Sequence, residues 1–155
     1  MAGNKKVDYA WAAAHRASQA YQPTHPNGVE MNVNEAVEAW VRLWNTYDLD
    51  DVRRLFLDDD RVTYFSSEKR GLIKGIDSLV RHHEEFGFAA GGRETGNRLW
   101  LEEVDVEEFT DSAAVKAEWL FQRKGSDEAQ RGPVTILYVK TGDSWKIAHA
   151  HFSNY

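Results

Sequence analysis

The chain has 155 residues, a net charge of −6 and no cysteine. This length predicts one domain with a single core, and the negative charge argues against nucleic acid as a partner. The lack of cysteine excludes disulfides and thiolate chemistry, and no apolar run is long enough to cross a membrane. Residues 1–6 are polar with no apolar segment after them, so we expect no secretory signal and a cytoplasmic protein.

The first part of the chain is predicted to be an N-terminal helical arm. Residues 8–22 are rich in alanine, which favours a helix, and Pro23 and Pro26 end it. Residues 1–31 are therefore interpreted as an arm and linker, and residues 32–155 as the domain. The arm is either a surface helix ahead of the domain or a segment that packs on a partner subunit.

Three helices are predicted at the start of the domain. Asn32 is a good N-cap, and apolar residues then recur at helical spacing through Tyr47, which predicts one long helix. A short second helix follows Asp48, and a third begins after Gly75. His83 falls near the centre of the apolar stripe of this third helix.

Strands dominate the second half of the chain. A short strand is predicted at 62–65 with a loop at 68–74, and four longer strands follow at 97–109, 113–123, 132–140 and 145–155. Helices first and antiparallel strands last predict an α+β domain, in which three helices pack on one face of a strongly curved, mostly antiparallel sheet.

The last strand is predicted to lie in the interior of the sheet, because an unpaired strand would leave backbone groups exposed. Strand side chains alternate between faces. The two faces would carry Trp145, Ile147, His149, His151 and Ser153 on one side and Ala148, Ala150 and Phe152 on the other. Both histidines would then point the same way.

A family resemblance rests on four segments in order: Tyr47-Asp48-Leu49-Asp50-Asp51-Val52, Leu55-Phe56-Leu57-Asp58-Asp59, Lys74-Gly75-Ile76-Asp77 and Trp145-Lys146-Ile147-Ala148-His149-Ala150-His151-Phe152-Ser153. They resemble the NTF2-like superfamily, and the last is similar to the SnoaL-like branch and to the association domain of calcium/calmodulin-dependent kinase II. Over residues 32–155 the resemblance implies a cone with a hydrophobic pocket at its open end, and a homodimer joined through the outer sheet face. Because this fold hosts isomerases, dehydratases, cyclases, hydrolases and assembly modules, it does not fix the function.

The chain departs from the catalytic pattern of ketosteroid isomerase within that superfamily. The position of its helical tyrosine falls on Trp40, and that of its general base falls on Tyr64. Strand 133–140 has no acid to act as a second oxyanion donor. Steroid isomerase chemistry is therefore disfavoured, and the Asp-Arg-Asp grouping of limonene epoxide hydrolase has no recognisable counterpart.

The pocket implied by this resemblance would be lined by aromatic and imidazole side chains: Trp40, Trp44, Tyr64, His83, Trp119, Tyr138, His149 and His151. Such walls suit a small organic ligand, although tryptophans at helical spacing also serve as plain core packing. Arg98 would either hold a carboxylate ligand, as arginines do in the kinase association domain, or form a salt bridge at the rim.

Three functions stay open at this point. The first is a SnoaL-like isomerase, lyase or cyclase without an organic cofactor, in which His149 or His151 is the base and Tyr64 or Tyr138 donates to developing negative charge. The second is a non-catalytic ligand-binding or oligomerisation domain with purely structural imidazoles. The third is a metal-dependent lyase or oxygenase in which His83, His149 and His151 would be the ligands; it ranks below the first, because most members of the family need no metal.

Overall fold

A computed structural model describes residues 31–155, so the predicted helix at 8–22 and its linker lie outside the described residues. Helices and strands follow in the predicted order: α2 (Val33–Thr46), α3 (Asp50–Leu55), β1 (Thr63–Phe65), β2 (Ile73–Lys74), α4 (Ile76–Glu85), β3 (Arg98–Glu108), β4 (Ser112–Gln122), β5 (Ala129–Thr141) and β6 (Ser144–Phe152). Within these residues no helix has the length and apolar composition needed to span a bilayer.

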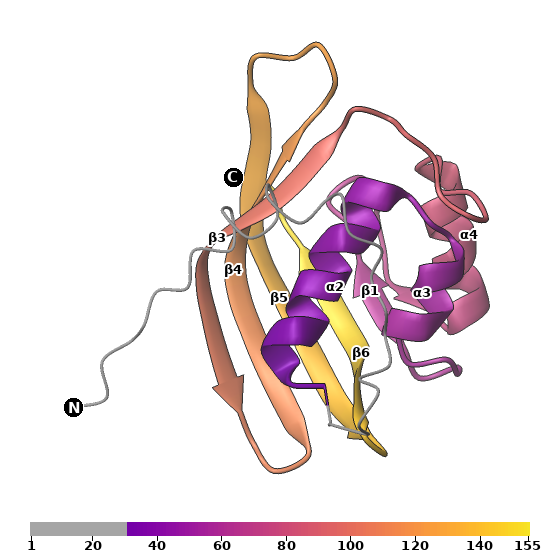
Figure 1. Cartoon of the computed structure of the whole chain (residues 1–155), viewed down its shortest axis with the longest axis vertical. Coiled ribbons are helices and arrows are strands. Elements are labelled where there is room, and N and C mark those ends of the chain that lie inside the picture. Colours follow the sequence, from indigo (N-terminus) through magenta and orange to yellow (C-terminus); the bar gives the residue numbers. More distant parts are fainter. Residues whose placement is uncertain (1–30) are drawn as a thin grey trace.

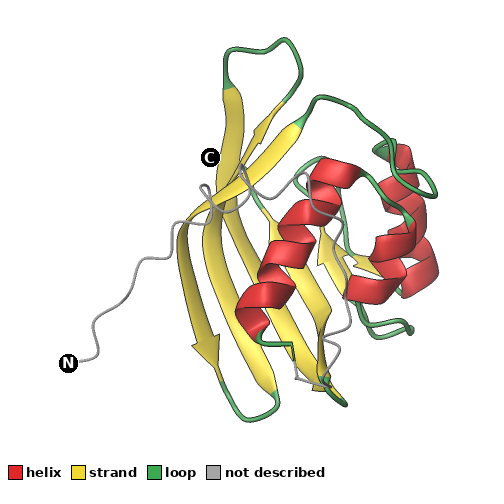
Figure 2. Cartoon of the chain, viewed as in Figure 1, coloured by secondary structure: helices red, strands yellow, loops and turns green. Residues whose placement is uncertain are grey.

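The strands form one sheet in the order β2-β1-β6-β5-β4-β3. All neighbours are antiparallel except β1 and β6, which run parallel. Figure 1 shows the sheet curving around α2, and Figure 2 shows that the helices cover only one of its faces. The predicted α+β cone and the interior position of β6 are confirmed, although β6 ends at Phe152 and the predicted loop at 68–74 contains β2.

Helix α2 fills the inner face, which is the face of the sheet toward the helices. Asn32 caps it as predicted, because its Oδ1 accepts from the backbone N–H of Glu35 at 2.9 Å. Tyr47, in the left-handed conformation, ends it. The buried stripe of α2 consists of Val33, Ala36, Val37, Ala39, Trp40, Val41, Leu43 and Trp44.

Strand β6 contains a β-bulge that reverses the predicted faces. Tyr138 pairs with Ile147 but the preceding Leu137 pairs with His149, so Ala148 is an extra residue in β6. The residues that face inward are therefore Trp145, Ile147, Ala150 and Phe152, all of them buried. The prediction that both histidines share a face with Trp145 is wrong: they point to the opposite side, where His151 is exposed.

The outer face is the side of the sheet away from the helices. It carries Thr63, Phe65, Thr135, Leu137, His149 and His151 on three adjacent strands. His149 Nδ1 lies 2.7 Å from Thr63 Oγ1, and the rings of Phe65 and His151 are 4.9 Å apart. Leu137 leaves 40% of its surface exposed, so this face is partly apolar.

The side-chain amide of Asn45 joins α2 to the edge strand β3. Its Nδ2 donates to Leu99 O at 3.0 Å, and its Oδ1 accepts from Leu99 N–H at 3.0 Å. This amide therefore replaces a neighbouring strand at the open edge of β3, where backbone groups would otherwise lack a partner.

Asn45→Ala should lower the free energy of unfolding by about 2 to 4 kcal/mol, because it leaves both backbone groups of Leu99 without their partner. Urea denaturation measures this loss. Thr46→Ala is the matched control, since Thr46 is the exposed neighbour in the same helix, and it should change stability by less than about 0.5 kcal/mol. Equal effects of the two substitutions would contradict the role given to Asn45.

Candidate functional site

A small cavity opens between the C-terminal half of α2 and the inner face of the sheet. We call it the mouth cavity; it is lined by Trp44, Tyr64, Ser66, Ser67, Glu68, Phe86, Leu99, Trp119, Phe121, Arg123, Gln130 and Phe152. Its volume of about 30 Å³ is room for about two water molecules. A larger ligand therefore requires some of the lining side chains to move.

Aromatic rings make the walls of the mouth cavity. Trp44 contacts the rings of Phe86, Phe121 and Phe152 at centroid distances of 5.8, 6.3 and 6.0 Å. Trp119 packs on Phe152 at 5.6 Å, and its Nε1 donates to the carbonyl of Ser153 at 2.9 Å. These walls favour a flat or compact apolar ligand.

Polar side chains gather at the entrance. Gln130 Nε2 donates to Glu68 Oε1 at 2.8 Å and to Asn154 Oδ1 at 2.9 Å, and Asn154 Nδ2 donates to Ser67 O at 3.1 Å. This chain of hydrogen bonds ties the loop after β1 to the C-terminal residues. Arg123, which also lines the cavity, stacks on Phe121 at 5.2 Å.

Two buried histidines of α4 lie directly behind Tyr64. The ring of Tyr64 is 5.5 Å from His82 and 5.9 Å from His83. Burial raises the pKa of the Tyr64 hydroxyl, so it keeps its proton at neutral pH. The cluster therefore offers one phenolic donor next to two imidazoles.

The imidazole of His83 is held in one tautomer. Its Nδ1 is 2.8 Å from Leu79 O, a carbonyl that can only accept, so Nδ1 carries the proton and Nε2 is the open acceptor. Burial, opposed by the hydrogen bond to Leu79 and aided by the nearby His82, lowers the pKa of His83 to about 4. Among residues 31–155, Nε2 of His83 and both ring nitrogens of His82 lack a hydrogen-bond partner.

The His149 and His151 side chains lie outside the cone, because the bulge at Ala148 turns them onto the outer face. Burial, with the neighbouring His151, lowers the pKa of His149. The predicted convergence with His83 on a metal is wrong, since His83 is inside and the pair is outside. In the part of the chain that the structure describes, no three histidine or acidic side chains are grouped as metal ligands.

The remaining predicted site residues divide between three places. Trp44, Tyr64 and Trp119 do line the mouth cavity. Trp40 is fully buried and packs on Phe152 at 5.5 Å. Tyr138 lines a different cavity, described below.

Arg98 is the last predicted site residue, and the prediction that it faces the pocket is wrong. It is exposed on β3, on the outward side that it shares with Trp100, and its guanidinium stacks on that ring at 5.0 Å. Leu99, the residue between the two, is the one that turns inward to the mouth cavity.

The sequence analysis missed the polar rim of the mouth cavity. Ser66 and Ser67 fall in no predicted element, Glu68 falls in the predicted loop at 68–74, and Gln130 falls in the predicted hairpin loop, although β5 already begins at Ala129. Short polar segments between strands carry no pattern that distinguishes a rim from an ordinary turn. Only the fold brings them to the same opening.

Comparison with known proteins places this geometry in a family. Residues 33–155 match the model of the SnoaL-like domain. No curated protein shows a significant match. The fold is similar to that of an NTF2-like protein of unknown function from Pseudomonas putida KT2440, with a TM-score of 0.67, 19% identity and coverage of 78% of this chain and 82% of that one.

Two further solved structures share the fold. A candidate dehydratase of the NTF2-like family from Streptomyces avermitilis has a TM-score of 0.68 and 19% identity, covering 79% of this chain and 93% of that one. The association domain of CaMKII from C. elegans has a TM-score of 0.64 and 22% identity, covering 79% and 92%. At these identities the likeness shows the fold alone, whereas the family model spans nearly all the described residues. The chain therefore belongs to the SnoaL-like domain family and has the NTF2-like fold.

Proposed function

We propose that this chain is a SnoaL-like enzyme that moves a proton on a compact, mostly apolar molecule bearing a carbonyl or hydroxyl group, bound at the mouth cavity. The observation that carries this proposal is the His83 imidazole, fixed by Leu79 O with Nε2 open, whose ring lies 5.9 Å from the ring of Tyr64. A base, the group that orients it and a neighbouring donor are the elements of general acid–base catalysis.

Tyr64 is proposed as the donor to the oxygen that gains negative charge. It lines the mouth cavity, and burial keeps its pKa raised, so the hydroxyl donates rather than ionises. A donor already in place in a low-dielectric site stabilises an enolate or alkoxide more than water does.

His83 is proposed as the base, in place of His149 and His151. A base with a pKa near 4 is deprotonated at neutral pH, and such a base can remove a proton next to a carbonyl when a donor stabilises the oxyanion. His83 lies behind Tyr64 and Trp44, whose rings are 5.9 and 5.6 Å away. Substrate must therefore displace part of that aromatic wall to reach Nε2.

Exchange of the α-protons of cyclohexanone for deuterium, followed by proton NMR in D₂O, tests the proposal. The wild-type protein should accelerate the exchange over buffer, and Tyr64→Phe should reduce the acceleration by about 10² to 10³ because one oxyanion donor is lost. His83→Leu should abolish it.

The control for this experiment is the double substitution of His149 and His151 by alanine, which should leave the acceleration intact because both lie on the outer face. Loss of exchange in that control, with Tyr64→Phe still active, would refute the site. Thermal melting of each variant separates a lost site from a lost fold.

The buried state of His83 should also make stability depend on pH. Its pKa in the folded state, about 4, is below the ordinary value of 6.5, so the unfolded chain takes up the proton first as pH falls. The stabilisation is complete above pH 6.5 and is lost toward pH 4. At about pH 4.5 the loss relative to neutral pH amounts to about 2 to 3 kcal/mol.

Urea denaturation at about pH 7.5 and about pH 4.5 measures this difference. His83→Leu should lose less stability between the two pH values than the wild type does. Phe88→Leu is the control, since Phe88 packs on the His83 ring at 5.0 Å but does not titrate, and it should keep the wild-type difference. An unchanged pH difference in His83→Leu would show that this imidazole is not held neutral by burial.

A second candidate function, an assembly domain, is favoured by the outer face. Phe65, Leu137 and the two histidines form a partly apolar surface over β1, β6 and β5. We propose that two copies of the chain pair through this face. An apolar surface rimmed by polar groups is typical of a subunit interface.

Leu137→Glu should convert the proposed dimer to a monomer, because a carboxylate at the centre of the interface would be buried without a partner. Light scattering after gel filtration at about 10 µM chain measures the mass. Phe109→Glu is the matched control: Phe109 is 55% exposed at the β3–β4 turn, away from the outer face, and should leave the dimer intact. A monomeric wild-type chain would refute the pairing.

A further inference from the structure

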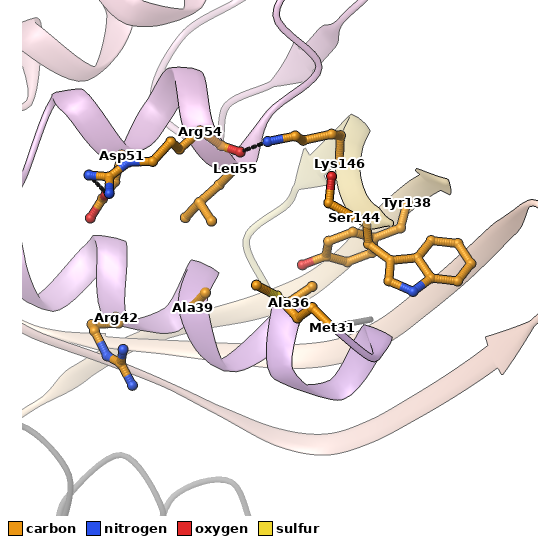
Figure 3. Close-up of a pocket in the computed structure, with 11 residues that line it drawn as sticks. Met31, Ala36, Ala39, Arg42, Asp51, Arg54, Leu55, Tyr138, Ser144 and Lys146 are labelled. Carbon is orange, nitrogen blue, oxygen red and sulfur yellow. Dashed lines mark hydrogen bonds and ion pairs between the residues drawn. The ribbon is translucent and has the colours of Figure 1, made fainter. Parts of the chain in front are cut away.

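A second cavity lies at the other end of α2 and shares no lining residue with the mouth cavity. It is enclosed by α2, α3 and the β5–β6 hairpin, and its volume is about 150 Å³ (Figure 3). An apolar cavity of about this size can hold a molecule as large as benzene. This cavity is larger than the mouth cavity and lies outside the site proposed above.

The space exists because α2 presents small side chains here. Ala36 and Ala39 lie one turn apart on the helix and face Leu55 of α3 across the cavity (Figure 3). The aromatic side chains of Tyr138 and Trp145 also line it. These walls are apolar and include an aromatic surface on which a ring or a branched chain can pack.

Positive charge surrounds this cavity in a chain whose net charge is −6. Arg42, Arg54 and Lys146 line it, against the single carboxylate of Asp51. Arg54 is already paired with Asp51. Arg42 also acts on the charge of Asp51, so Lys146 is the cation that an anionic ligand would meet.

Among the described residues, no carboxylate forms an ion pair with Lys146. Its Nζ donates to the backbone carbonyl of Arg54 (Figure 3). Burial lowers the pKa of Lys146, and the nearby charge of Asp58 only partly opposes this. An anion bound beside the Lys146 ammonium would offset the free energy lost when this charge is removed from water. The neutral carbonyl of Arg54 offsets it only in part.

We propose that this second cavity binds a small carboxylate with an aromatic or branched apolar tail. The carboxylate accepts from Lys146 Nζ, and the tail packs between Ala36, Ala39 and Tyr138. The site is independent of the proposed enzyme activity, because no residue of the mouth cavity takes part in it.

Calorimetric titration of the full chain with benzoate, and with benzamide as its neutral counterpart, tests the proposal. Benzoate should bind at least about tenfold more tightly than benzamide, which corresponds to about 1.4 kcal/mol. Lys146→Met should remove this preference by weakening benzoate alone. Equal binding of both compounds, or an unchanged preference in Lys146→Met, would overturn the proposal.

Ala39→Leu provides a second variant that does not depend on Lys146. It fills the cavity with apolar atoms at little cost in helix propensity, so the fold should hold while binding of both compounds is lost. Tyr64→Phe, in the mouth cavity, should leave benzoate binding unchanged. Binding that survives Ala39→Leu, or that is lost in Tyr64→Phe, would place the ligand elsewhere and refute this site.

Discussion

The extra residue Ala148 in β6 decides which side chains enter the interior of the cone. The bulge is anchored outside the sheet, because the backbone N–H of Leu57 donates to Ile147 O at 2.8 Å. Without it, Phe152 would turn outward and leave its contacts with Trp44 and Trp119, and His149 would turn inward. The aromatic walls of the mouth cavity and the composition of the outer face thus depend on the same local irregularity.

The cluster of Tyr64, His82 and His83 places polar groups in surroundings that are otherwise apolar. A buried polar group without a partner lowers the stability of the fold by about 1 to 3 kcal/mol. Leucine in place of His82 or His83 would fill the same space without this loss. Both imidazoles sit against rings, such as Phe86 at 5.1 Å and Phe88 at 5.0 Å, that cannot accept an N–H strongly. Local costs of this kind are typical of sites where binding or chemistry, rather than stability, sets the residue.

Local patterns were enough to predict α2 with its Asn32 cap, the order of helices and strands, and the interior place of β6. The family resemblance, not a local pattern, gave Trp44, Tyr64 and Trp119 as pocket residues, and all three line the mouth cavity. Local patterns could not predict the bulge. Ala148 and Ala150 are equally small, and histidine is compatible with either face of a sheet, so the alternation of side chains along β6 fits both orientations of its second half. Nor could they predict that Glu68 and Gln130 meet, because only the folded sheet brings these distant residues together.

The mouth cavity must widen to admit any ligand much larger than water, and the structure limits where that can happen. Trp119 and Phe121 belong to β4, which is paired along both edges, so that wall is rigid. Phe86 is only half-buried at the end of α4, followed by Gly87 with φ +94°, a conformation that suits glycine. Further along the chain, the backbone of Gly92 packs directly on α2, because a Cβ at this position would lie only 2.8 Å from Thr46 O. Among the aromatic side chains that line the mouth cavity, Phe86 alone is not fully buried, so its ring has the most freedom to move. It lies at the same end of α4 as His82 and His83, and under the proposed function the substrate would enter there.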